Sequence, residues 1–137
     1  MRTLVDASVW IPYFTGRRSP RADWLDATLG RAALLVADLT LLQVLRGLPD
    51  DAEREKAREA LFKFPVISTG GHDIALKAAA HLRALTAAGA PQPPLPQTLI
   101  ATACLAHGLH LLHEDRAYEP FEKHLGLEIP GLVVEVW

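Results

Sequence analysis

Short apolar runs alternate with helical patterns along this chain, and this alternation constrains its fold more than any other feature. Five runs have the length and composition of strands: residues 3–5, 34–36, 64–69 (FPVIST), 110–112 and 131–137 (GLVVEVW). Helical segments separate consecutive runs. Strands joined through helices favour a parallel sheet, so the sequence predicts an α/β protein with about four or five parallel strands and helices on both faces.

The helical segments are recognised by residues typical of helix ends. They are a helix that begins after Asp6 and carries Val9 and Phe14, residues 19–30, a helix that follows Asp38 and carries Gln43, and residues 50–63, 73–88, 96–107 and 115–124. The stretch GAPQPPLPQ is too short for a domain linker and is interpreted as a stiff connection. With half of its 137 residues apolar, the chain has the size of one common domain, so we expect a single domain over residues 1–137.

Composition limits the possible partners and compartment. The chain has 14 basic and 16 acidic residues, so its net charge is close to zero. Any surface that binds phosphate must therefore be a local one. Cys104 has no second cysteine to pair with, which favours a reducing compartment, the cytoplasm. We find neither a signal-peptide pattern nor an apolar segment of membrane-spanning length, so we expect a soluble protein without a membrane partner.

Three of the expected strands end at or near an aspartate: Asp6, Asp38 and Asp115. Parallel sheets bind ligands at the carboxyl ends of their strands, so these residues are candidates for a shared site. The alternative is that each aspartate caps the helix that follows it, which is common at such boundaries. A dinucleotide site is not expected, because no glycine-rich turn follows the first strand.

Four segments together resemble one protein family over essentially the whole chain. They are LVDASVWI, LTLLQVLRG, TLIATACLAHGLHLLHEDRAYEPF and LGLEI, and their order and spacing resemble the PIN-domain ribonuclease toxins of the VapC type. The resemblance implies a PIN-like three-layer fold and cleavage of RNA by acidic residues that bind Mg²⁺ or Mn²⁺. It also implies two protein partners, a cognate antitoxin and a second copy of the chain as a homodimer.

The resemblance assigns roles to particular residues. Asp6, with Ser8 two positions later, matches the first acid of the family. Asp115 matches the acid of the later H-x-D turn, with His113 in the imidazole position. Asp6 and Asp115 are therefore expected to be catalytic and to bind metal, and Ser8 and His113 to support them.

Three positions that are usually acidic in this family are not acidic here. The glutamate of L-x-E-V-L-x-G falls on Gln43, the aspartate of I-D-x-L-I-A falls on Gln97, and a further aspartate falls on Ala117. An amide offers an oxygen but no charge, so we expect weakened metal binding and less repulsion in the metal-free pocket. In this hypothesis Gln43 and Gln97 orient water or bind metal weakly.

Two other interpretations of the amides stay open. Gln43 and Gln97 are ordinary helix residues if the alignment is shifted by one or two places. Alternatively, the chain is a catalytically impaired pseudo-nuclease that retains antitoxin or RNA binding. A small phosphatase-like enzyme is excluded, because position 8 is Ser and the D-x-D spacing is missing.

Basic and aromatic residues add candidates for contact with partners. Arg46, three residues after Gln43, and the GRRSPR cluster with Arg17 and Arg18 are expected to contact RNA phosphates, or else to be solvated. Zinc binding by His110 and His113 is disfavoured, because successive residues of a strand point to opposite faces, and so do residues three positions apart. The aromatic and apolar residues Trp10, Ile11, Phe14 and Trp24 are expected to pack in the core or against a partner.

Overall fold

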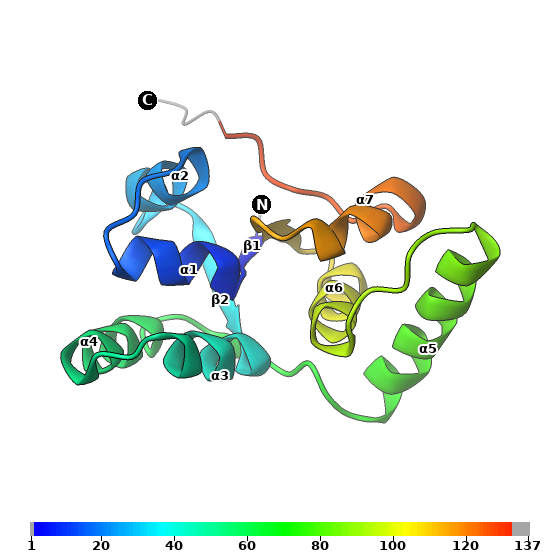
Figure 1. The fold of residues 1–137 in the computed structure, drawn as a ribbon, viewed down its shortest axis with the longest axis horizontal. Coiled ribbons are helices and arrows are strands. Elements are labelled where there is room, and N and C mark those ends of the chain that lie inside the picture. The colour runs from blue at the N-terminus through cyan, green and yellow to red at the C-terminus, as the bar shows by residue number, and fades with distance from the viewer. Residues whose placement is uncertain (1, 133–137) are drawn as a thin grey trace.

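A parallel sheet lies at the centre of this computed structural model, which describes residues 2–132 (Figure 1). Its strands are β1 (Arg2–Val5), β2 (Ala33–Ala37), β3 (Val66–Ile67) and β4 (His110–Leu112), in the order β3-β2-β1-β4. Each neighbouring pair is parallel. The predicted parallel α/β fold and four of its expected strands are confirmed. The fifth expected strand, residues 131–137, lies outside the described residues except for its first two positions.

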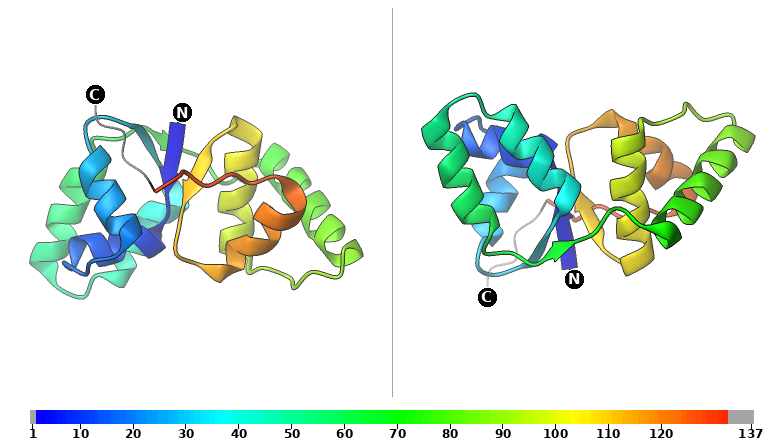
Figure 2. Two further views of the ribbon diagram at one scale, coloured as in Figure 1. Left: turned by 90° about the horizontal axis from the view of Figure 1, so that it is seen from above. Right: turned by 90° about the horizontal axis from the view of Figure 1, so that it is seen from below.

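Helices cover the sheet in two groups (Figure 2). The first group is α1 (Ala7–Phe14), α2 (Pro20–Thr28), α3 (Asp38–Gly47) and α4 (Asp51–Leu61), and the second is α5 (His72–Ala87), α6 (Leu95–His107) and α7 (Glu119–Leu125). The segment expected as one helix over residues 115–124 is divided: a 3₁₀ turn, Arg116–Tyr118, precedes α7. Asp115 caps this turn and Pro120 lies in the first turn of α7, where a missing N–H is tolerated. Every helix in the described range is too short or too polar to cross a bilayer.

Alternation along the strands produces two apolar cores, one on each face of the sheet. Val5 of β1 and Leu112 of β4 pack with residues of α1 to α4. Their neighbours Leu4 and Leu111 pack on the opposite face with residues of α5, α6 and α7. Successive side chains of a strand point to opposite faces, so strands buried on both faces are apolar at nearly every position. This explains why the strands could be recognised as apolar runs.

Gly47 allows a close approach between α3 and α1. A Cβ atom at this position would lie 2.6 Å from Cδ1 of Ile11. A larger residue would therefore require the Ile11 side chain to move. The glycine of the VLRG segment thus has a packing role at the end of α3.

Candidate active site

Asp6 lies between the end of β1 and the start of α1, and only 4% of its surface is exposed. Its Oδ2 atom accepts hydrogen bonds from the backbone N–H of Ser8 (3.0 Å) and from the Ser8 hydroxyl (2.7 Å). Its Oδ1 atom accepts a hydrogen bond from the Tyr118 hydroxyl at 2.6 Å. Asp6 therefore caps α1, as the capping interpretation expects, and its carboxylate also belongs to a larger polar network.

Asp115 lies just beyond the end of β4 and is partly buried. Its Oδ1 atom accepts a hydrogen bond from the backbone N–H of Ala117 (2.9 Å) and caps the 3₁₀ turn. Its Oδ2 atom accepts a hydrogen bond from the side-chain amide of Gln97 on α6 (3.1 Å). Two predicted site residues from different elements are thus in direct contact.

A chain of hydrogen bonds connects the segments that carry the two carboxylates. The Ser8 hydroxyl, which donates to Asp6, also accepts the backbone N–H of Glu114 at 2.9 Å. The backbone N–H of Asp6 donates to the carbonyl of Leu112 (2.9 Å). The carboxyl ends of β1 and β4 therefore meet at one edge of the sheet, as parallel pairing requires.

The hydroxyl of Tyr118 lies against the carboxylate of Asp6. Burial raises the pKa of this phenol, and the charge of Asp6, the hydrogen bond to Asp6 and the charge of Asp115 raise it further. Its ring is fully buried. Tyr118 therefore stays protonated under physiological conditions and acts as a hydrogen-bond donor.

The side chain of His113 binds the backbone of the turn that carries Asp115. Its Nδ1 atom accepts the backbone N–H of Asp115 (3.1 Å), so the proton of a neutral ring lies on Nε2. That Nε2 atom is 3.3 Å from Oε2 of Glu122 on α7. By contrast, His110 contacts Glu128, so the two histidines have different partners.

Gln43 and Gln97 share one property in this structure. In each side chain the amide oxygen is buried and has no hydrogen-bond partner among the described residues. Gln97 is tied to Asp115 through its nitrogen, whereas Gln43 lies on α3 with no such bond recorded to either carboxylate. A buried oxygen without a donor is uncommon in folded proteins.

Asp38, at the end of β2, has a different role from Asp6. Its Oδ1 atom accepts hydrogen bonds from the backbone N–H of Leu39 (2.8 Å) and from the backbone N–H (3.0 Å) and hydroxyl (2.6 Å) of Thr69. Partial burial opposes its ionisation, but these hydrogen bonds outweigh it and lower the pKa of Asp38. This aspartate therefore connects the end of β2 to the loop after β3.

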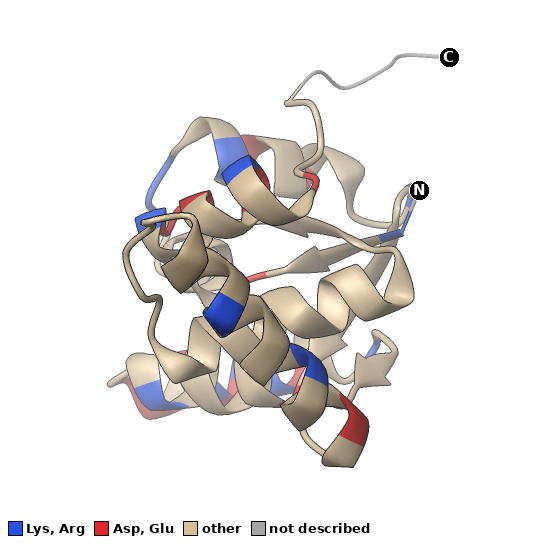
Figure 3. Cartoon of the chain, turned by 90° about the vertical axis from the view of Figure 1, so that its right-hand side faces the viewer, with Lys and Arg blue, Asp and Glu red and all other residues tan. Residues whose placement is uncertain are grey.

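The arginines beside the site differ from those expected. A hollow of about 460 Å³ is lined by His113 and Asp115 together with Arg21 and Arg116. Arg17, Arg18 and Arg46 are exposed and do not line it, and Arg18 pairs with Asp23 (2.9 Å). On the side shown in Figure 3, Lys and Arg are interspersed with Asp and Glu.

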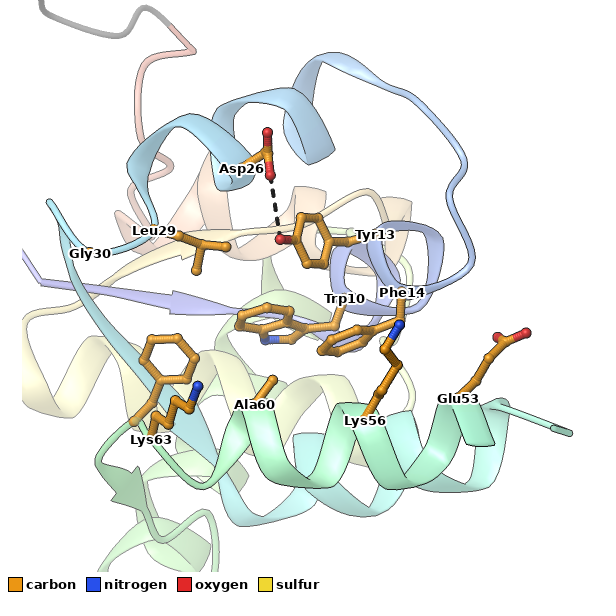
Figure 4. A pocket seen from close by; sticks show the side chains of 11 residues that line it. Trp10, Tyr13, Phe14, Asp26, Leu29, Gly30, Glu53, Lys56, Ala60 and Lys63 are labelled. Atoms are coloured by element: carbon orange, nitrogen blue, oxygen red, sulfur yellow. Dashed lines mark hydrogen bonds between the residues drawn. The ribbon is translucent and has the colours of Figure 1, made fainter. Parts of the chain in front are cut away.

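A second feature is an aromatic groove between α1, α2 and α4, with a volume of about 850 Å³ (Figure 4). Trp10 forms its floor and is stacked on Phe14, with ring centroids 5.5 Å apart. Tyr13 donates a hydrogen bond to Asp26 (3.4 Å), and Lys56 of α4 and Lys63 just after α4 line the groove from the other side. Trp10 and Trp24 are buried in the core, as expected, whereas Phe14 is half-buried and accessible from the groove.

The donor set determines which metal ions the site could bind. In residues 2–132, no three His, Cys, Asp or Glu side chains gather as a metal-binding group. Two carboxylates, Asp6 and Asp115, and the amide of Gln97 against Asp115 are the oxygen-rich kind of donor set that suits one Mg²⁺ or Mn²⁺ ion that keeps much of its water. They do not fit a pair of ions, which needs carboxylates on both sides.

Sequence reasoning missed two side chains that contact the site. Tyr118 bonds to Asp6, and Glu122 faces His113. Tyr118 follows Asp115 by three residues, a spacing that places it near Asp115 in a helical turn but does not indicate its bond to Asp6. Glu122 has no comparable signal, because its position depends on how α7 packs.

This chain is similar to known proteins both in sequence and in fold. The sequence model of the PIN domain family matches residues 3–123. The fold is similar to a chain of VapBC2 from Rickettsia felis bound to a DNA fragment from its promoter, with a TM-score of 0.74, 11% identity, and coverage of 95% of this chain and 98% of that one. It is also similar to a chain of DNA-bound VapBC from Salmonella typhimurium, with a TM-score of 0.70, 14% identity, and coverage of 97% of this chain and 99% of that one. A chain of a toxin-antitoxin complex from Klebsiella pneumoniae has a TM-score of 0.69, 23% identity, and coverage of 96% of this chain and 98% of that one.

Proposed function

Because this chain belongs to the PIN domain family, we propose that it is the toxin of a type II toxin-antitoxin pair and a metal-dependent endoribonuclease with weakened metal binding. The observation that carries the proposal is the hydrogen-bonded network joining the Asp6 and Asp115 segments at the carboxyl edge of the sheet. The structures of similar fold, which are described as VapBC and toxin-antitoxin complexes, support it. Its place of action is the cytoplasm, and a second copy of the chain is an expected partner.

In this proposal Asp6 and Asp115 bind one Mg²⁺ or Mn²⁺ ion. When bound, such an ion neutralises phosphate charge and lowers the pKa of a bound water. Ser8 orients Asp6, while His113 fixes the backbone at Asp115. Arg21 and Arg116, beside Asp115, are placed to contact RNA phosphates by charge, a role that the sequence suggested for Arg17, Arg18 and Arg46.

Restoring charge at the two amides is expected to strengthen the site. The double variant Gln43→Glu with Gln97→Asp adds two negative charges, so it should bind Mn²⁺ more tightly and cleave a structured RNA faster than the unaltered chain. Calorimetry measures the binding and a gel assay measures the cleavage. Gln92→Glu, at an exposed position of the proline-rich connection, is the control for added charge.

Each outcome of this experiment has a definite meaning. Equal binding and equal cleavage would contradict the weakening by Gln43 and Gln97. Cleavage by the double variant alone would favour the second candidate, a pseudo-nuclease that keeps its partner binding. The aromatic groove is the observation that favours this candidate, because it provides a binding surface apart from the carboxylates.

We further propose that the aromatic groove binds an apolar segment of the antitoxin. Ala60→Arg should block this binding, because it puts a long charged side chain on the α4 wall of the groove without disturbing the helix. Ala52→Arg is the matched control, since Ala52 is exposed on the same helix and does not line the groove. Co-purification with the cognate antitoxin measures the effect. Undiminished binding by the Ala60 variant would place the antitoxin elsewhere.

A further inference from the structure

The proposed catalytic mechanism gives no role to the hydrogen bond from Tyr118 to Asp6. This bond is short, at 2.6 Å, and its acceptor is an aspartate with 4% of its surface exposed. A hydrogen bond to a carboxylate is stronger than a neutral one, and more so where water is excluded. The hydroxyl therefore compensates part of the Asp6 charge in the absence of a cation.

Tyr118 is not required to orient the Asp6 side chain. The other oxygen, Oδ2, already accepts two hydrogen bonds from Ser8, one from its backbone and one from its hydroxyl. These bonds fix the carboxylate at the start of α1 whether or not Tyr118 contributes. Loss of the Tyr118 hydroxyl would therefore remove charge compensation and leave the orientation largely intact.

Asp115 is compensated in a similar way. One of its oxygens accepts the Ala117 N–H and the other accepts the Gln97 amide, which is also neutral. Each oxygen of the two carboxylates thus has a donor from the chain itself. In the metal-free site these carboxylate oxygens are all hydrogen-bonded, and a cation must compete with their donors for the same negative charge.

We propose that Tyr118 sets the metal affinity of this site by stabilising its metal-free form. The inference rests on the proposed role of Asp6 as a metal ligand. A bound cation withdraws negative charge from the carboxylate, so the hydrogen bond from Tyr118 is weaker in the metal-bound state than in the metal-free state. By linkage, a bond that favours the metal-free state lowers the affinity for the metal. Tyr118 therefore contacts neither metal nor substrate in this proposal and acts on the metal through Asp6.

Titration with Mn²⁺ alone, followed by calorimetry, tests this inference. Tyr118→Phe removes only the hydroxyl and should tighten Mn²⁺ binding by about tenfold, because bonds to charged groups are among the stronger ones. Tyr13→Phe is the matched control: Tyr13 is the other tyrosine, and its hydroxyl donates to Asp26 at the surface. Its Mn²⁺ affinity should equal that of the unaltered chain.

A second measurement checks that the effect passes through Asp6. Without metal, Tyr118→Phe should lower the melting temperature, and this loss should shrink when Asp6 is also changed to Asn. Unchanged or weaker Mn²⁺ binding in Tyr118→Phe would overturn the inference and leave the proposed function standing. If neither the unaltered chain nor Tyr118→Phe binds Mn²⁺, or if Asp6→Asn does not reduce binding, the proposed metal site fails together with the inference.

Discussion

Replacement of Asp6 by asparagine is expected to reduce RNA cleavage by about a hundredfold to a thousandfold, the loss typical when one electrostatic group of an active site is removed. Asparagine keeps the shape of the side chain and can still cap α1 through its carbonyl oxygen. The fold should therefore persist while the negative charge is lost. Cleavage of a structured RNA in Mn²⁺ measures the effect, and circular dichroism verifies the fold.

Asp50→Asn is the matched control for this variant. Asp50 caps α4 by accepting the backbone N–H of Glu53 (3.1 Å), and it does not belong to the polar network around Asp6. It should cleave RNA at the unaltered rate. If Asp6→Asn retained full activity, the nuclease signal would come from a contaminant or from another site, and the proposed function would be wrong.

Trp10→Ala is expected to produce the largest loss of stability, about 3–5 kcal/mol of unfolding free energy. The indole is 1% exposed. It contacts Phe14 in a stacked geometry and Tyr13 and Phe64 at 5.9 and 5.7 Å between ring centroids. Its removal would leave a large cavity under the aromatic groove.

Urea denaturation monitored by circular dichroism measures this change in unfolding free energy. Phe62→Ala is the control, because Phe62 is 63% exposed and its truncation should cost only about 0.5 kcal/mol. A loss below about 1 kcal/mol in Trp10→Ala would mean that the region collapses around the cavity or that Trp10 is less tightly packed.

The main elements of the fold were predictable because the sheet is buried on both faces. In β2, for example, Leu34, Leu35 and Val36 are all buried, so the strand is recognisable as a continuous apolar run. The prediction was less accurate at β3, where the run over residues 64–69 contains only Val66–Ile67 as strand. Among the strands of residues 2–132 it pairs with β2 alone, at the edge of the sheet, and Pro65 has no N–H to donate.

The candidate site could be recognised from the sequence only where its residues lie at or soon after the end of a strand. Asp6 and Asp115 fall at such boundaries, and the structure connects the segments that carry them. Asp38 has the same local pattern, yet it binds Thr69, 31 residues away, because the β3 loop lies beside it. The Tyr118 bond to Asp6 likewise depends on packing between distant segments, which local spacing does not encode.

The position of β1 between β2 and β4 has a consequence for synthesis on the ribosome. As the chain emerges, β1 can pair with β2 early, but its other edge stays open until residues 110–112 are available. Asp6 and Tyr118 are separated by 112 positions, so a nascent chain lacks this contact for most of its translation. The polar network around Asp6 is therefore completed only after residue 118 has left the exit tunnel, and a shorter nascent chain lacks the Tyr118 donor.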